Sequence, residues 1–187
     1  MILAAPTALM TAEEFALLPD AERYELLDGQ LVEREMSNTT TVIGGRIHQR
    51  FGNWCDAGHR GFVLPDGATY RLVRGKLGRV RKPDVSWFSQ ERWSPKLLAS
   101  TDIEIAPDLM VEVLSPNDNA YDIGLKVDEF FRAGTKEAWI VHPQVAQLER
   151  RFASGEARWH AADQPLDGAP MLPGFTLKLA DVLAGLA

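Results

Sequence analysis

The 187-residue sequence contains one cysteine, Cys55, which excludes an internal disulfide framework and a cysteine-rich zinc site. None of its four histidines has HxxH or HExxH spacing, so a catalytic zinc site is not expected. No stretch approaches the about 18 apolar residues that a membrane-spanning helix needs, and the apolar first ten residues lack the basic start of a signal peptide. We therefore expect a cytoplasmic protein that spans no membrane, with residues 1–10 as a flexible N-terminus and Met1 or Met10 as its start.

The overall composition is that of an ordinary globular protein. Hydrophobic residues make up 45% and charged residues 25% of the chain, which excludes a mainly disordered protein. This length is typical of one domain, which we expect over residues 11–187. The 26 acidic and 20 basic residues give a net charge of −6. A nucleic-acid partner would therefore need a local basic patch, because the chain as a whole repels phosphate.

Local patterns predict an alternation of helices and strands. Asp28-Gly29 between two β-prone runs predicts a hairpin, apolar residues at helical spacing predict a long amphipathic helix over 39–57, and the nearly unbroken apolar run 109–114 predicts a strand buried on both faces. A short helix is expected from Thr11, another helix over 121–133, strands over 62–64, 69–73, 85–88, 137–141 and 175–179, a hairpin around 154–155, and a surface excursion over 89–107. This order predicts a mixed α/β (α+β) fold.

Glu112 is the most informative residue, because it interrupts the apolar run 109–114. A carboxylate buried there without a partner costs several kcal/mol, so it must be neutral, paired or bound to a cation. The alternative is that Glu112 faces solvent at a strand end. Asp84 follows Pro83 at the entrance of a predicted strand, which by itself favours a turn or cap aspartate.

Two further charged residues are of interest for their positions. Lys126 shares one face of the helix predicted over 121–133 with Asp122. It either forms an exposed pair with Asp122 or points toward the end of the strand that carries Glu112, since a helix that follows a strand commonly packs over its sheet. Glu25 lies in the predicted hairpin, and its spacing alone favours a solvated residue.

A basic strip precedes Asp84. Half of the twelve residues from 71 to 82 are basic and none is acidic: Arg71, Arg74, Lys76, Arg79, Arg81 and Lys82. Such a run is usually a solvated face. A phosphate-binding rim beside a metal-binding carboxylate is, however, what a nuclease requires, so this strip is where DNA phosphates are expected to make contact.

Several segments together resemble a bacterial family of putative restriction endonucleases, formerly a domain of unknown function, within the PD-(D/E)XK nuclease superfamily. In family order they are YELLDGQLVE (24–33), RKPDVSWFSQERW (81–93), PDLMVEVLSPND (107–118), DIGLKVDEFFRAG (122–134), EAWIVHP (137–143) and LPGFTLKL (172–179). The most specific is PDLMVEVLSP followed by the D…K…G helix. The resemblance implies a restriction-endonuclease-like core, a central mixed β-sheet flanked by helices, to which the N-terminal hairpin and the C-terminal strands are added.

The resemblance also implies a site. Asp84 is similar to the aspartate of the PD half and Glu112 to the acidic residue of the (D/E)XK half. The superfamily lysine is expected at Leu114; in this family it has moved to the following helix, where Lys126 stands. Glu25 is similar to an accessory glutamate supplied by an early element.

The function implied is metal-dependent hydrolysis of DNA. Asp84, Glu112 and the Val113 carbonyl would hold Mg²⁺, with Mn²⁺ as a possible substitute. Lys126 would orient the attacking water or stabilise charge, and Glu25 would bind a second metal or orient waters. Without metal, repulsion between the two carboxylates is expected to raise at least one pKa.

Two alternatives remain open at this stage. The first is a catalytically degenerate nucleic-acid-binding module of the same fold. The second is a structural or interaction protein in which Glu112 and Lys126 form a buried pair and Asp84 lies elsewhere. A homodimer is also expected, mainly from the resemblance, with Leu148, Phe152 and Trp159 of the tail hairpin available for contacts.

Overall fold

A computed structural model describes residues 9–34, 36–58, 61–73, 78–100 and 102–186, so most of the expected flexible N-terminus, residues 1–8, lies outside the described residues. The centre is a mixed six-stranded sheet, in which only the β5–β6 pair is parallel. In spatial order its strands are β3 (Phe62–Leu64), β4 (Val85–Phe88), β5 (Leu109–Val113), β6 (Glu137–His142), β7 (Gln147–Phe152) and β8 (Ala157–Ala161).

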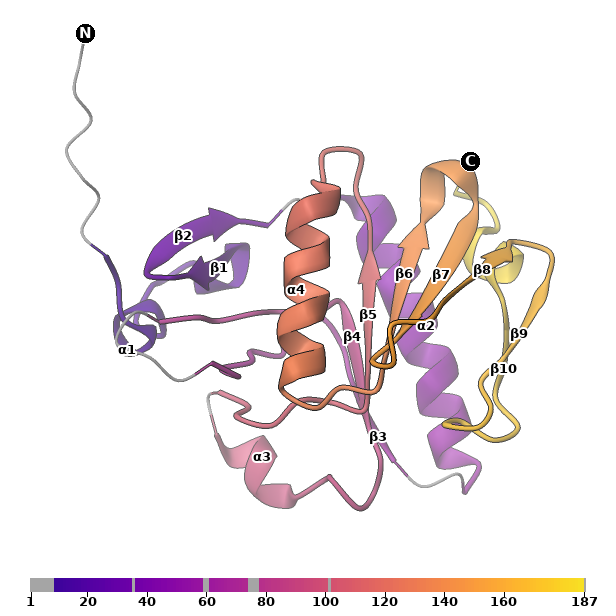
Figure 1. Ribbon diagram of the computed structural model, residues 1–187, viewed down its shortest axis with the longest axis horizontal. Coiled ribbons are helices and arrows are strands. Elements are labelled where there is room, and N and C mark those ends of the chain that lie inside the picture. Colours follow the sequence, from indigo (N-terminus) through magenta and orange to yellow (C-terminus); the bar gives the residue numbers. More distant parts are fainter. Residues whose placement is uncertain (1–8, 35, 59–60, 74–77, 101, 187) are drawn as a thin grey trace, which may run out of the picture.

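Two long helices cover opposite faces of this sheet (Figure 1). Side chains alternate along β5, so Val111 packs with α2 (Asn38–Asp56) and Met110 packs with α4 (Ala120–Arg132). Ser37 caps the first turn of α2 and Asn119 caps that of α4. The predicted helices, and the predicted double-sided burial of β5, are therefore confirmed.

The N-terminal part forms a separate hairpin beside α4 (Figure 1). It comprises α1 (Ala12–Phe15), the 3-10 turn η1 (Ala21–Arg23), β1 (Tyr24–Leu27) and β2 (Gln30–Glu33). Asp28 and Gly29 adopt φ of 50° and 82°, as a tight hairpin turn requires. Backbone hydrogen bonds between Leu26 and Val80 attach β1 to the segment that leads into β4, and this attachment brings Glu25 toward the central sheet.

The remaining elements show where local patterns were insufficient. The predicted strand 69–73 is wrong: within it only Tyr70 forms isolated bridges, to Arg81 and Ile103. The region 89–107 is not simply a surface excursion, because it contains α3 (Pro95–Ala99) and the buried Ile103. The last strand is the shorter β10 (Thr176–Lys178), which pairs with an unpredicted strand; the other C-terminal elements are η2 (Pro143–Val145), β9 (Pro165–Asp167) and α5 (Leu179–Leu183).

The tail hairpin, β7 and β8, forms one edge of the sheet. Leu148 is 1% exposed and belongs to the core, so the expectation that it is available for contacts with a second copy is wrong. Trp159 on the edge strand is 52% exposed.

The helices in the described part of the chain are too short or too polar to span a membrane.

Candidate active site

Asp84 and Glu112 lie side by side at one end of the sheet. Val85 pairs with Val111 in the antiparallel β4–β5 register, so Asp84, one residue before β4, lies next to Glu112. The Val113 N–H donates to Asp84 Oδ2 at 2.6 Å, and the Asp84 N–H donates to the Val111 carbonyl at 3.1 Å. Strand pairing therefore fixes the Asp84 carboxylate through one of its two oxygens.

Glu112 meets Lys126, which projects from α4 onto the same face of β5. Lys126 Nζ donates to Glu112 Oε2 at 3.0 Å and lies 2.9 Å from Oε1. The second contact has the distance of an ion pair but not the geometry of a hydrogen bond, and the buried Oε1 accepts no hydrogen bond. Both side chains are almost fully buried. The sequence interpretation in which Glu112 faces solvent is thus wrong, as is the exposed Asp122–Lys126 pair.

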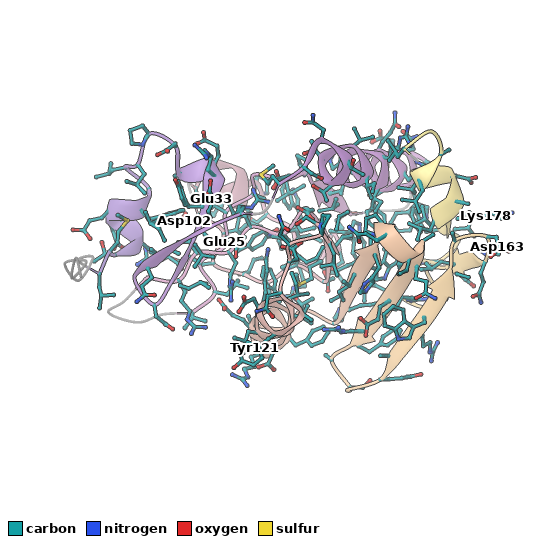
Figure 2. The ribbon with its side chains drawn as sticks, turned by 90° about the horizontal axis from the view of Figure 1, so that it is seen from above. Glu25, Glu33, Asp102, Tyr121, Asp163 and Lys178 are labelled. Carbon is teal, nitrogen blue, oxygen red and sulfur yellow. The ribbon has the colours of Figure 1, made fainter. Side chains whose placement is uncertain are left out.

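Glu25 completes the group from the hairpin side. Its Oε1 lies 2.8 Å from Lys126 Nζ and accepts the Lys82 N–H at 2.7 Å, and its Oε2 accepts from Arg81 Nη1 at 2.9 Å. In Figure 2 Glu25 lies between the hairpin and the central sheet. Because Glu25 is 7% exposed, the expectation of a solvated residue is wrong. Both its oxygens are already engaged, so it differs from Asp84 and Glu112.

An alternating chain of charges continues outward from Glu25. Arg81 Nε donates to Glu129 Oε2 at 3.1 Å, and Arg79 Nη1 donates to the same oxygen at 3.2 Å. Arg79 then forms two hydrogen bonds with Asp28, at 2.8 and 2.6 Å, at the exposed tip of the hairpin. This ion-pair network holds the hairpin against α4 and fixes the position of Glu25.

Sequence reasoning missed Arg34, which follows β2. Its side chain is 9% exposed; Nη2 lies 2.6 Å from Asp66 Oδ1 and 3.5 Å from Asp84 Oδ1. Asp66 lies on the turn after β3. No local pattern marks either residue, because their approach depends on the hairpin and the β3 turn meeting at the sheet end.

These residues line a cavity of about 510 Å³. Its wall also includes the first turns of α2 and α4 and the glycines Gly44 and Gly45. Of the described residues that line it, seven are acidic and three are basic: Glu25, Glu33, Asp66, Asp84, Glu112, Asp118 and Asp122, against Arg34, Arg81 and Lys126. The cavity therefore favours cations and, without one, repels phosphate.

The pKa values of the three site carboxyl groups are shifted in different directions: those of Glu112 and Asp84 are raised, and that of Glu25 is lowered. Burial raises the pKa of Glu112 to about 8 although Lys126 opposes the shift, and the charge of Asp84 adds to it. Burial raises the pKa of Asp84 to about 6, against Lys126 and the Val113 N–H. For Glu25, burial is outweighed by Lys126 and Arg81, which lower the pKa to about 2. A raised pKa was expected from the sequence, but burial rather than mutual repulsion is its main cause.

The donor atoms fit a hard divalent cation. Glu112 Oε1 is buried without a hydrogen bond, and Asp84 Oδ1 has only the 3.5 Å contact with Arg34. Each carboxylate thus has one oxygen that accepts no close hydrogen bond, although Lys126 Nζ lies 2.9 Å from that of Glu112. Carboxylate oxygen is the ligand that Mg²⁺ and Mn²⁺ prefer. Among the described residues no group of three His, Cys, Asp or Glu side chains is arranged for a metal, so backbone or water oxygens would have to complete the shell.

The basic strip is not a continuous exposed surface. Arg81 and Lys82 are 4% and 3% exposed; Arg81 belongs to the ion-pair network, and Lys82 Nζ donates to the Ala21 carbonyl. Their placement in a phosphate-contacting strip is therefore corrected, because their charges are used inside the fold. Arg71 and Arg79 are partly exposed and pair with Glu13 and Asp28. Arg74 and Lys76 lie outside the described residues.

Comparison with known proteins concerns the family and the fold of the chain. The model of the Uma2 family, described as "Putative restriction endonuclease", matches residues 12–180. Similar solved structures include that of "a putative nuclease belonging to DUF820" from Anabaena variabilis ATCC 29413, with a TM-score of 0.80 and 17% identity over 95% of this chain and 99% of that chain. At this identity the similarity concerns the fold, and it confirms the predicted fold class. Among proteins with curated descriptions, none matches the chain.

Proposed function

Because the chain belongs to the Uma2 family, described as "Putative restriction endonuclease", we propose that it is a metal-dependent endonuclease that hydrolyses DNA phosphodiester bonds. The observation that carries the proposal is the convergence of Asp84, Glu112 and Lys126 on one cavity. Two adjacent carboxylates beside a buried ammonium group form a site that can bind a dication and act on phosphate.

Asp84 and Glu112, together with the Val113 carbonyl, are the residues that would hold Mg²⁺ or, as a substitute, Mn²⁺. Such an ion lowers the pKa of a bound water and offsets charge on phosphoryl oxygens. The protein supplies the geometry: the Val113 N–H fixes Asp84, and β5 fixes Glu112 beside it. The acidic excess of the cavity supports a cation requirement, since phosphate would otherwise be repelled.

Lys126 would orient the attacking water or stabilise charge on the phosphoryl group. An ammonium group has three N–H donors, and the oxygens within 3.0 Å of Nζ come from three sources: Glu112, Glu25 and the Lys82 carbonyl. Lys126 must therefore give up one of these contacts to reach substrate. We assign this exchange to Glu112, because the other two hold Lys126 in place.

Glu25 acts in this proposal as a positioning residue. Both of its oxygens already accept hydrogen bonds from groups of the fold, which favours a positioning role over contact with a second metal or a water. By contacting Lys126 at 2.8 Å, Glu25 keeps the ammonium group charged and in place. This role replaces the metal or water contact expected from the sequence.

A homodimer remains part of the proposal. Two active sites that face the two strands of a duplex would follow from two-fold symmetry. With Leu148 in the core, Trp159 is the large exposed apolar residue on the edge strand β8. A strictly monomeric mass at high micromolar concentration would contradict this part.

A DNA substrate also agrees with the cytoplasmic location expected from the sequence.

The test is a plasmid-nicking assay with Mg²⁺, with Mn²⁺ and with EDTA, on the wild type and on Asp84→Asn. Asp128→Asn is the matched control, because it makes the same chemical change at a half-exposed side chain that pairs, within the described part of the chain, with Arg132. We expect metal-dependent nicking that Asp84→Asn abolishes and Asp128→Asn retains.

The alternatives predict different results. A degenerate binding module would bind DNA but not nick it with any divalent metal. A structural protein with a buried Glu112–Lys126 pair would neither bind divalent metal nor lose any property in Asp84→Asn. Because Asp84 lies beside that pair and not elsewhere, the structure favours the enzyme over this last reading.

A further inference from the structure

Three basic side chains line the cavity, and they are not equally committed to the fold. Arg81 lies between Glu25 and Glu129, at 2.9 and 3.1 Å. Lys126 has carboxylate or carbonyl oxygens on three sides. Among the described residues, Arg34 has one short ion pair, to Asp66, whose side chain is 34% exposed on the turn after β3. Its Nη1 also donates a longer hydrogen bond to the Glu22 carbonyl, at 3.4 Å. Arg34 is therefore the cavity cation that can change partner at the smallest cost.

The position of Arg34 indicates where a new anionic partner would bind. Its Nη2 lies 3.5 Å from Asp84 Oδ1, the oxygen of that carboxylate that the Val113 N–H does not use. An anion bound by Arg34 would therefore sit directly beside the oxygen that we assign to the cation. A guanidinium group offers a planar fork of donors that matches two phosphate oxygens, and Arg34 has more donors than its present contacts use.

The wall beyond Asp84 leaves room for such an anion. Gly45 lines the cavity, and a Cβ built on it would meet no atom within 4 Å. Gly45 thus faces open space, whereas a Cβ on its neighbour Gly44 would lie 3.7 Å from the Asp84 side chain. The first turn of α2, with its positive helix end, borders the same space and adds a favourable field for an anion.

We propose that Arg34 is a phosphate-binding residue of the site, which contacts a backbone phosphate of DNA beside Asp84. In the free protein Asp66 neutralises Arg34 and holds it near Asp84; with DNA bound, the phosphate takes the place of Asp66 as the main partner. This inference rests on the proposed function, since it assumes a nucleic-acid substrate. It adds a residue that neither the family pattern nor the basic strip identified.

The test measures binding separately from cleavage. Fluorescence anisotropy of a labelled DNA duplex is recorded in Ca²⁺ at several salt concentrations for the wild type, Arg34→Gln and Arg23→Gln. Arg23 is the matched control: it lies before the same hairpin, is 59% exposed and pairs with Glu33. We expect Arg34→Gln to weaken binding about tenfold and to lower the salt slope by about 0.9, the value for one lost phosphate contact. Arg23→Gln should stay within about twofold of the wild type.

Two further variants keep the test decisive if Arg34→Gln folds poorly. Asp66→Asn removes the competing anion without touching Arg34 and should retain or strengthen DNA binding. Gly45→Leu fills the open space from a helical position that suits leucine, so it should retain Mn²⁺ binding by calorimetry but lose DNA affinity.

The outcomes separate this inference from the proposed function. If the wild type nicks plasmid while Arg34→Gln binds DNA with unchanged affinity and salt slope, the inference is wrong and the nuclease stands. Equal losses in Arg34→Gln and Arg23→Gln, or unchanged binding in Gly45→Leu, also overturn it. If the wild type neither binds nor nicks DNA, the proposed function fails first.

Discussion

Glu112 and Glu137 are buried carboxylates on the neighbouring parallel strands β5 and β6, at opposite ends of their pairing. Glu137 Oε1 accepts from both Trp139 Nε1 and Arg150 Nε. Arg150 is held in turn by the Asp167 carbonyl at 2.7 Å and packs over the rings of Trp139 and Phe152. Glu112 shares one lysine with Glu25 and keeps one oxygen without a hydrogen bond.

The difference between the two residues lies in the donors that reach one buried oxygen of each: Glu137 Oε1 accepts two hydrogen bonds, whereas Glu112 Oε1 accepts none. A buried carboxylate whose donors are supplied by its own fold holds strands together. A buried carboxylate with an oxygen that accepts no hydrogen bond, beside a second acid and in a cavity with an acidic excess, costs stability until a cation binds. The arrangement of Glu137 fits a structural role. The arrangement of Glu112 is what a metal-dependent site requires before the metal binds.

The largest expected effect is on cleavage. Glu112→Gln should lower the rate of plasmid nicking by at least about 10³-fold, because it removes a charged ligand of the cation and with it several kcal/mol of charge stabilisation. Glu137→Gln should leave the rate of the folded protein within about threefold. Comparable losses in the two variants would show that the contrast between the residues is not functional.

The second effect is on stability, where the Glu137 variant should lose more than the Glu112 variant. Glu137→Ala leaves the buried Arg150 without its partner and should lower the free energy of unfolding by about 3–5 kcal/mol. Glu112→Gln should leave it unchanged or higher in EDTA, because it removes a costly buried charge and Lys126 keeps Glu25. Urea denaturation of both variants measures this. A large loss of stability in Glu112→Gln would instead favour the structural reading of the Glu112–Lys126 pair.

The pH dependence sharpens the comparison further. Asp84 and Glu112 have pKa values raised to about 6 and about 8 from ordinary values of 3.8 and 4.5. The folded state therefore binds these protons more tightly than the unfolded state, and the free energy of unfolding should fall as pH rises from about 4 to 8. We expect a fall on the order of 1–3 kcal/mol in EDTA. It should shrink in Glu112→Gln and on addition of Mg²⁺, which binds the charged carboxylates of the folded protein.

Glu25 should contribute the opposite slope. Its pKa is lowered to about 2 from an ordinary value of 4.5. Its contribution to stability is complete above pH 4.5 and is lost as pH falls toward 2. A denaturation series from pH 2 to 9 therefore reports Glu25 at its acidic end and the Asp84–Glu112 pair above pH 4. A curve without any fall between pH 4 and 8 would contradict the raised pKa values.

The elements that could be predicted from the sequence are those with a local cause. The Asp28-Gly29 turn, the periodic helix α2 and the apolar strand β5 carry their own signals. Glu112 could be found in the same way, because a charge inside an apolar strand is unusual wherever the strand lies. The strand expected at 69–73 failed because its β-prone residues form only isolated bridges to distant segments.

The rest of the site depends on contacts between distant segments. Glu25 is buried only because β1 attaches to Val80 and so meets Arg81, 56 residues further along the chain. Arg34 meets Asp84 across 50 residues. The burial of Arg81 and Lys82 could not be predicted for the same reason: although adjacent in sequence, they turn toward different partners inside the fold.

The smallest expected effect lies at the exposed end of the ion-pair network. Asp28→Asn removes the negative charge that pairs with Arg79 through two hydrogen bonds. The effect should be small, because the Asp28 side chain is 63% exposed. Its backbone has φ of 50°, which asparagine adopts readily. We expect a loss of less than about 1 kcal/mol in urea denaturation, as for other exposed ion pairs.

Cleavage by Asp28→Asn should stay within about twofold of the wild type, since Arg81 and Glu129 are buried and still hold Glu25. The informative comparison is with Glu25→Gln, which weakens the hold on Lys126 directly and should lower the rate of nicking about 10- to 100-fold. If Asp28→Asn lowered the rate as much as Glu25→Gln does, the charge at the hairpin tip would act on the site through the whole network. The division between the structural interior and the site would then have to be redrawn, with the hairpin as part of the catalytic machinery rather than its support.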